Sequence, residues 1–559
     1  MANHRAIIKI NAKSRKEADW MVKYADPREW TEYPPENVRT RHEEYETYRN
    51  LLMGRHKDVF CNNTKNIHHK RSETALMHDA AALYDDGDLY VSANYCKMAS
   101  QIFANILFGT PPKYRIEAEG AGIDAIQQQR IDQIAIDNML SVTNHQQEVE
   151  ASHLGGAVYR LRWGKMNNWR TDGVIIEALP VDVYEPILSP DNIKDNQGGV
   201  LSFPFEYNGA NYLYREIYEP GKISYMLNEM MGNSIGAQIP LESVPFYAHI
   251  TDAAKAGNDN YHMDGNTVIF ETDYPGMFIE YVPNWTKPDL YFGISDYSPD
   301  VISNQCAINA IKTGILRVCL KHMDPKLALP EGLMTQDPMT GKWYIQKEDM
   351  EAIEVPDAVA SALPRYVTWD AKLDAAQLNI DACFEAMMMS MQISPAVFGW
   401  EKYGQADSAA ALKLRMTLTL WMVSQKRTYF DAALKNILYA AQYLDGRYGA
   451  AKYEPMEVSI TWPDPLPVDE STEASALKTM LGSKLISVET AVSRIQGIEG
   501  EALENELNLI AKDNRAQQIV ELGQLAAYQA ISPDAMLRIY RGENIEDVLR
   551  SAKAPIAEN

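Results

Sequence analysis

The side chains that could perform catalysis lie in short, separate stretches of the chain. "GNSIG", Gly232 to Gly236, has the spacing of a nucleophile elbow, in which Ser234 would attack a carbonyl carbon. An elbow needs a strand before the serine and a helix after it. Here the arm of a predicted β-hairpin precedes the serine, and "AQIPLESVP" with its two prolines follows. We therefore expect a loop at this place and keep a serine hydrolase at Ser234 as a remote alternative.

Metal and nucleotide motifs are incomplete or absent. Cys61, His68 and His69 are zinc-type donors, but a structural zinc site needs a fourth, so ordinary polar surface is the expectation. Asp85-Asp86-Gly87-Asp88 lacks the spacing of a calcium loop and indicates a turn. The sequence contains no GxxxxGK[ST], no HExxH and no GxGxxG. We predict that the protein is not an enzyme and uses no cofactor and no metal.

Composition indicates a large folded protein with an acidic surface. The chain has 559 residues, of which 46% are hydrophobic and 23% charged, with five scattered cysteines that we expect to be reduced. It has no run of 18 apolar residues, so no membrane span is expected, and its first residues are too polar for a secretory signal. The formal net charge of −23 argues against tight binding of nucleic acid, because that binding depends on neutralising phosphates.

The elements that position these residues follow from hydrophobic periodicity. A helix is predicted from about Ser92 to Leu107, and a meander of antiparallel strands from Ala157 to about Tyr281. Turn dipeptides, Asn208-Gly209 and Pro220-Gly221, separate several of the strands.

The second half is predicted to be mainly helical. Ser298 is the expected N-cap of a helix to about residue 322, with Pro299 at its first position. A helix over 373–391 ends at Ser394-Pro395, a long helix runs from about Ser408 to Leu444, and short helices fill residues 469–553. The helix from Ser298 to about residue 322 is apolar on two sides, which predicts that other parts of the protein pack against it on two sides. The methionines at 387–389 and 391 indicate either core packing or an adaptable interface.

The order of these elements resembles the portal proteins of tailed bacteriophages, of the siphophage type. Four stretches carry the resemblance, which spans roughly residues 90 to 510: "ANYCKMASQIFANILFGTPP", "FGISDYSPDVISNQCAINAI", "ISPAVFGWEKYGQADSAAALKLR" and "LKTMLGSKLISVETAVSRI". In the third, Asp407-Ser408 precedes Ala411-Leu412-Lys413, where the family commonly has Ser-Gly.

The resemblance implies an α+β portal fold with eight parts. These are an N-terminal segment at the wing periphery (1–90), a β-rich wing (91–294), a first stem helix (295–322), a small α/β clip (323–372), a second stem helix (373–391), a tunnel loop (392–408), a long helix with the return to the wing (409–468) and a helical crown (469–559).

The resemblance also implies a function and its residues. The chain would form a homo-oligomer, a ring of twelve, at one capsid vertex, as a channel for packaging and ejecting double-stranded DNA without sequence specificity. Expected partners are the large terminase subunit, a head-completion or tail adaptor, and capsid and scaffolding proteins; the expected location is the virion, after assembly in the host cytoplasm. Another head, neck or baseplate protein without a channel is the alternative.

The resemblance further implies three sets of site residues. The tunnel loop would contain Gly399, Trp400, Glu401, Lys402, Tyr403 and Gly404. The stem interface between subunits would contain Val301, Ile308, Ile311, Ile315, Val318, Ile380, Phe384 and Met387. Partner docking at the clip would use Trp343, Tyr344 and Tyr366.

Overall fold

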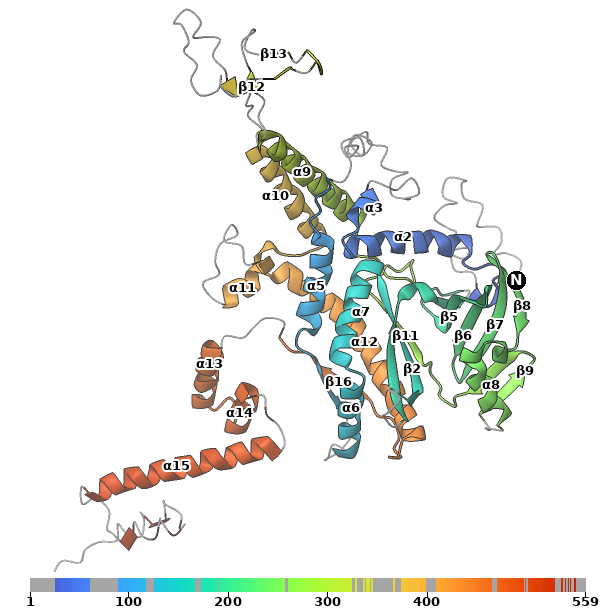
Figure 1. The fold of residues 1–559 in the computed structure, drawn as a ribbon. Helices are drawn as coiled ribbons and strands as arrows, with labels where there is room; N and C mark the ends of the chain where they lie inside the picture. The colour runs from blue at the N-terminus through green and yellow to red at the C-terminus, as the bar shows by residue number, and fades with distance from the viewer. Residues whose placement is uncertain are drawn as a thin grey trace, which may run out of the picture. The chain divides into compact units, whose positions relative to one another are not determined.

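The chain divides into two compact units, Met1–Pro465 and Leu466–Asn559, which are described separately. A computed structural model describes residues 26–60, 89–116, 125–165, 172–189, 191–256, 260–323, 327–328, 335–336, 338–341, 343–344, 365–366, 373–398, 409–464, 470–496, 498, 501–527 and seven residues between 534 and 548. Helices and antiparallel sheets both occur in the first unit, which confirms the predicted α+β class (Figure 1).

The helices of the N-terminal third pack against one another. After a short 3-10 turn, η1 (Pro27–Glu29), they are α2 (Glu36–Leu52), α3 (His56–Phe60), α5 (Tyr95–Phe108), α6 (Ala125–Asp137) and α7 (Leu140–Leu154). Of these, α6 and α7 also contact strands of the first unit. The helix predicted from Ser92 begins at Tyr95, because Asn94 caps it: Asn94 Oδ1 accepts a hydrogen bond of 2.9 Å from the Lys97 N–H.

A seven-stranded sheet confirms most of the predicted meander. Its strands run in the order β4 (Tyr184–Leu188), β5 (Asn196–Tyr207), β6 (Ala210–Glu219), β7 (Lys222–Met231), β10 (Thr267–Glu271) and β9 (Tyr261–Asp264), while β8 (Ser234–Ile239) also pairs with β7. Asn208 and Gly209 both have positive φ in the tight turn between β5 and β6, as a two-residue hairpin requires. The short helices η3 (Leu241–Ser243), η4 (Pro245–Tyr247) and α8 (Ala248–Lys255) interrupt the meander.

A second, three-stranded sheet lies at the centre of the main hydrophobic core. Its order is β11 (Ile279–Pro283), β2 (Gly156–Lys165), β3 (Asp172–Leu179), and η2 (Val181–Val183) connects it to β4. Helices α7 and α12 (Thr417–Tyr448) both contact this sheet. Two strands far apart in sequence, β1 (Lys113–Ile116) and β16 (Val458–Thr461), form an antiparallel pair. This pair joins the segment that follows α12 to the segment between α5 and α6.

Two helices lead away from the sheets and lie side by side (Figure 1). They are α9 (Pro299–Met323) and α10 (Leu373–Ser390), close to the predicted ranges. Ser298 caps α9 as expected, since its Oγ accepts from the Val301 N–H at 3.5 Å. Between them the described residues include the paired strands β12 (Leu327–Ala328) with β15 (Arg365–Tyr366), and β13 (Thr335–Gln336) with β14 (Trp343–Tyr344).

The predicted long helix is divided. After η7 (Pro395–Phe398), the chain forms α11 (Ala409–Arg415) and then α12, with a turn at Met416. The division lies at Met416, whose φ of −89° and ψ of 2° depart from helical values, and Thr417 Oγ1 next to it donates to the carbonyls of Lys413 at 3.1 Å and Leu414 at 2.8 Å.

The second unit contains three helices, α13 (Glu470–Gly482), α14 (Val488–Gln496) and α15 (Glu501–Ala527). The expectation of short helices is wrong for α15, which has 27 residues. Ser487 in the "ISVETA" stretch is the N-cap of α14, because its Oγ accepts from the Thr490 N–H at 3.0 Å. The "ISVETA" stretch, which contributed to the resemblance, therefore forms the N-terminus of a helix.

Candidate functional site

Helices α9 and α10 hold the residues predicted for the stem interface. Five of the eight are buried inside the single chain: Val301, Ile308, Ile380, Phe384 and Met387. Ile311 and Ile315 are half-buried against the same core, and Val318 is also half-buried. These side chains hold the helix pair together within one subunit. A role in contacts between subunits stays a prediction for them.

Phe384 connects the helix pair to the rest of the unit. Its ring lies 4.8 Å from that of Tyr95 at the start of α5 and 5.3 Å from that of Phe398 in η7, both edge-on. Edge-to-face aromatic pairs at such distances are favourable beyond the area they bury. The base of α10 is thus fixed on two sides.

A ladder of polar side chains on α9 was not predicted from the sequence. Gln305, Asn309 and Thr313 are buried at successive turns of the helix and bind the extended backbone of residues 91–95. The N–H groups of Tyr95, Ala93 and Val91 each donate at 3.1 Å, to Gln305 Oε1, Asn309 Oδ1 and Thr313 Oγ1 respectively. This ladder binds the segment just before α5, whose first turn is capped by Asn94. Three polar residues at steps of four, which share one face of a helix, were the available signal.

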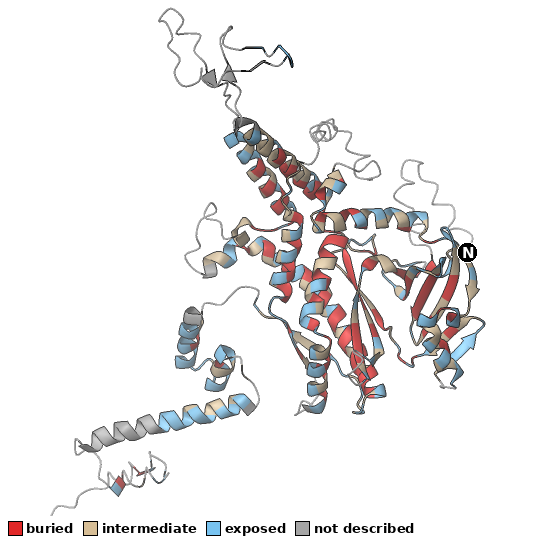
Figure 2. Cartoon of the chain, in the orientation of Figure 1, coloured by how far each residue is buried: buried red, intermediate tan, exposed pale blue. Residues whose placement is uncertain are grey.

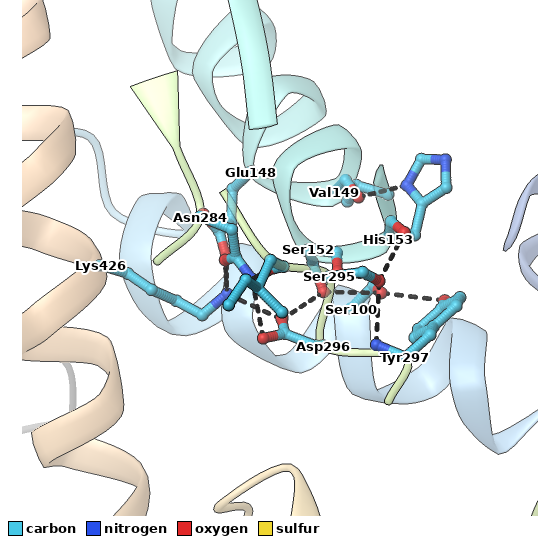
Figure 3. Close-up of polar contacts among 11 residues, drawn as sticks. Ser100, Glu148, Val149, Ser152, His153, Asn284, Ser295, Asp296, Tyr297 and Lys426 are labelled. Atoms are coloured by element: carbon cyan, nitrogen blue, oxygen red, sulfur yellow. Dashed lines mark hydrogen bonds and ion pairs between the residues drawn. The ribbon is translucent and has the colours of Figure 1, made fainter. Parts of the chain in front are cut away.

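The polar cluster around Lys426 is the most deeply buried charged group of the first unit among the residues described (Figure 3). Lys426 Nζ of α12 lies 3.0 Å from Glu148 Oε1 of α7 and 2.8 Å from Asp296 Oδ2, just before α9. It also donates to Asn284 Oδ1 and lies 4.5 Å from the centre of the Phe103 ring of α5. One ammonium group therefore joins the long helix, two N-terminal helices and the segment that leads into α9.

Hydroxyl groups extend this Lys426 cluster. Ser152 Oγ is 2.7 Å from Asp296 Oδ2 and 2.8 Å from Ser100 Oγ, which in turn is 3.0 Å from the Tyr297 hydroxyl (Figure 3). Asn284 Nδ2 donates to the other oxygen of Asp296 at 2.8 Å. Asp296 is held from three sides, so the start of α9 has a fixed position relative to α7 and α12.

The charges in the Lys426 cluster do not balance. Two carboxylates face one ammonium group, and Glu148 Oε2 has no hydrogen-bond partner within the described structure. Burial, and next to it the charge of Asp296, raises the pKa of Glu148 to about 7 against the pull of Lys426. Burial alone would lower the pKa of Lys426, but Asp296 and Glu148 outweigh it and raise that pKa.

We expect a pH-dependent effect of Glu148→Gln. A glutamate whose folded pKa is about 7 stabilises the fold through its bound proton fully below the unfolded value of 4.5, and this contribution is lost as the pH rises through 7. The variant cannot lose that contribution, so its free energy of unfolding relative to the natural chain should be higher at pH 8 than at pH 5.5. Urea unfolding at both values measures this; Glu457→Gln, at an exposed position, is the control. An equal difference at both pH values would contradict the assignment.

A clamp joins the end of α10 to the division between α11 and α12. Ser394 Oγ donates to the Arg415 carbonyl at 2.7 Å, and the Ser394 N–H donates to Thr419 Oγ1 at 2.7 Å. Residues 395–414 therefore leave and return at one place. The predicted tunnel-loop residues, Gly399 to Gly404, fall within this stretch but outside the described residues.

The remaining predicted residues are placed only in part. Trp343 and Tyr344 form β14, and Tyr366 belongs to β15, but their side chains are outside the described structure. Cys61, His68, His69 and Asp85–Asp88 are also outside it. Histidine, cysteine and acidic residues within the described ranges form no group of three that could hold a metal ion.

Ser234 does not have the geometry of a nucleophile elbow. It is the first residue of β8 and follows β7 through a tight turn at Gly232, so strand leads to strand rather than to helix.

No helix in the part of the chain described is long and apolar enough to cross a bilayer.

One family model matches part of this chain. Residues 380–519 match the model described as "Phage portal protein, SPP1 Gp6-like". Among solved structures, the neck of an empty GTA particle computed with C6 symmetry is 12% identical with a TM-score of 0.36, and the virion of a native gene transfer agent (GTA) particle is 11% identical with a TM-score of 0.38. Each alignment covers 75% of this chain and 93% of the other. No curated protein matches the sequence.

Proposed function

We propose that this chain, whose residues 380–519 match the phage portal proteins and confirm the predicted resemblance, forms a ring at one capsid vertex through which double-stranded DNA passes. This match is the main support for the proposal, because it covers the end of α10, residues 395–414 between the two ends of the clamp, α12 and helices that follow it. Residues 1–465 would then contain wing, stem and clip, and residues 469–559 the crown, with the ring located in the virion after assembly in the host cytoplasm.

The charge of the chain supports a conduit rather than a binding protein for DNA. Twelve copies with a formal charge of −23 each would repel phosphates at every register of the duplex. A channel with this property lets DNA move without holding it, and it needs no sequence specificity. Energy for packaging would come from a partner, the terminase, since the sequence has no phosphate-binding loop.

Images of the purified protein test the proposal directly. Negative-stain class averages are expected to show rings with a central hole and countable subunits. Discs or rods without a hole would favour the alternative, a head, neck or baseplate component that has no channel. Monomers at micromolar concentration would contradict both.

We also propose that the clip, residues 323–372, is the docking surface for terminase and later for the head-completion adaptor. It contains the short strands β12 to β15, which connect the ends of α9 and α10, and aromatic residues are enriched in protein interfaces. Scrambling residues 336–350 should reduce capture of terminase at least several-fold in a pull-down. Ring formation by the same variant is the control, and undiminished capture by intact rings would count against this docking surface.

A further inference from the structure

Strand β6 carries two buried charged residues, Arg215 and Glu216, next to each other in the chain. Residues 213–218 are all buried, whereas the edge strands β8 and β9 contain no buried residue (Figure 2). Successive side chains of a strand point to opposite faces of the sheet, so the two charges have different neighbours. Both carboxylate oxygens of Glu216 accept from Arg160 Nη1, at 3.0 and 2.9 Å. Glu216 therefore has a counter-charge on its own face, which leaves the partners of Arg215 on the other.

Arg215 forms no ion pair with an acidic residue of the described chain, although it is only 4% exposed. Its Nη1 donates to the Pro27 carbonyl at 3.4 Å and its Nη2 to Asn228 Oδ1 at 3.2 Å, while Nε has no acceptor there. Burial lowers the pKa of Arg215, but a guanidinium keeps its proton in proteins. A buried positive charge without a negative one is strongly unfavourable, so an anion is expected at this place.

Three acidic residues around this face of the sheet are bound to other arginines. Asp26 and Glu219 both form ion pairs with Arg28, at 2.6 and 2.8 Å. Glu185, which its register with β5 places on this face, forms an ion pair with Arg41. None of these three carboxylates therefore serves the guanidinium on β6.

Two further donors without an acceptor lie beside Arg215. Ser202 of β5 is its direct register partner, which puts the two Cβ atoms about 4.5–5.5 Å apart, and the Ser202 hydroxyl is buried and unpaired. The segment from Pro27 to Tyr33 covers this face, since the Tyr33 hydroxyl donates to the Ser202 carbonyl at 3.4 Å. The Trp30 ring lies 6.1 Å from the Tyr33 ring, and its Nε1 is also buried without an acceptor. Guanidinium, hydroxyl and indole donors thus gather between two strands and one short segment.

We propose that a small anion of the size of chloride binds between β5, β6 and residues 27–33, where Arg215, Ser202 and Trp30 donate hydrogen bonds to it. A single-atom anion is favoured over phosphate or sulfate, because solvent reaches none of the three donor atoms and two of the side chains come from directly paired residues. The anion supplies the counter-charge of Arg215. It also links residues 27–33, and through them α2, to the sheet. This site does not depend on the proposed ring.

Hydrogen–deuterium exchange tests the site through the segment that the anion would hold. The Tyr33 N–H donates to the Asn233 carbonyl at 2.8 Å, and the Ile235 N–H donates to the Thr31 carbonyl at 2.9 Å. Both amides exchange when the segment leaves the sheet, and a ligand that binds only the docked form opposes that opening. We expect their exchange to be at least about threefold slower in chloride than in gluconate, an anion too large for the site, at equal ionic strength. Equal exchange in both anions would overturn the inference.

Substitutions separate this site from a general effect of salt. Arg215→Met removes the uncompensated charge, a change that folds tolerate, and should make the exchange independent of chloride. Trp30→Phe keeps an aromatic ring but loses one donor, so it should weaken the chloride effect even if Arg215→Met does not fold. Arg162→Met is the control and should keep the full effect, since Arg162 is half-exposed and has its own partner, Glu177, at 2.6 Å. A chloride effect that persists in folded Arg215→Met would contradict the site.

Equilibrium dialysis with radioactive chloride measures binding directly. The natural chain should bind one chloride per chain more than Arg215→Met does, and Arg162→Met should bind as the natural chain does. A folded natural chain that binds no more chloride than Arg215→Met would mean that water alone satisfies these donors, and would overturn the proposal.

Discussion

Replacing Lys426 with methionine is expected to lower the free energy of unfolding by about 3–5 kcal/mol. The ammonium group is buried between Glu148 at 3.0 Å and Asp296 at 2.8 Å, and its removal leaves two carboxylates in an interior without a counter-charge. Methionine keeps nearly the same length and volume, so lost packing contributes little. Urea unfolding followed by circular dichroism measures the change.

The same helix provides the control for this prediction. Lys435 forms an ion pair with Asp431 at 2.9 Å one turn away, but its side chain is exposed, and such pairs contribute less than about 1 kcal/mol. Lys435→Met should therefore leave stability nearly unchanged. Adding Glu148→Gln and Asp296→Asn to Lys426→Met should restore most of the loss, because the buried charges are then gone. A loss below about 1 kcal/mol for Lys426→Met alone would contradict the role given to this cluster.

The Lys426 cluster also sets the orientation of α9. Asp296 stands two residues before Ser298, which caps α9, and Lys426 belongs to α12, which follows the clamped loop. The cluster therefore fixes the direction in which α9 leaves the sheets relative to α12. If the proposed ring uses the predicted stem interface on α9 and α10, its contacts depend on that direction, and we expect a weakened cluster to reduce ring formation as well.

Local signals in the sequence predicted much of this fold. Ser298 with Pro299 specified the start of α9, and Asn208-Gly209 specified a hairpin, because a cap or a tight turn depends on a few neighbouring residues. The division of the long helix was missed. The residues around Met416 are compatible with an unbroken helix, and only the backbone angles of Met416 in the structure, φ −89° and ψ 2°, show that α11 and α12 are separate.

Local sequence patterns could not predict the Lys426 cluster. Lysine within "SQKRTY" is typical of an exposed helix face, whereas the structure places it among partners 278, 142 and 130 residues away in the chain. Pairings over such separations depend on the tertiary fold and leave no local pattern. The ladder of Gln305, Asn309 and Thr313 is intermediate: its spacing was readable, but its partner, the backbone of residues 91–95, was not.

The proposed channel makes a prediction for the loop between α10 and α11. Ser394 is bonded to the Arg415 carbonyl, so residues 395–414 start and end at a fixed point on the ends of three helices. Within this stretch of the sequence, Glu401 and Lys402 lie between Gly399 and Gly404 and offset each other in charge. A loop anchored in this way on every subunit would form a collar that touches phosphates without retaining the duplex.

Trp400→Ala and Lys402→Glu are therefore expected to leave ring assembly intact and to lower the amount of packaged DNA at least several-fold. The first removes the largest side chain through which neighbouring loops could contact each other, and the second replaces the loop's positive charge with a negative one that repels phosphate. Nuclease-protected DNA per particle, with rings counted by electron microscopy, separates packaging from assembly. Lys165→Glu, an equal charge change at an exposed position at the end of β2, is the control and should package normally. If both loop variants package full-length DNA at the natural rate, the loop only connects α10 to α11.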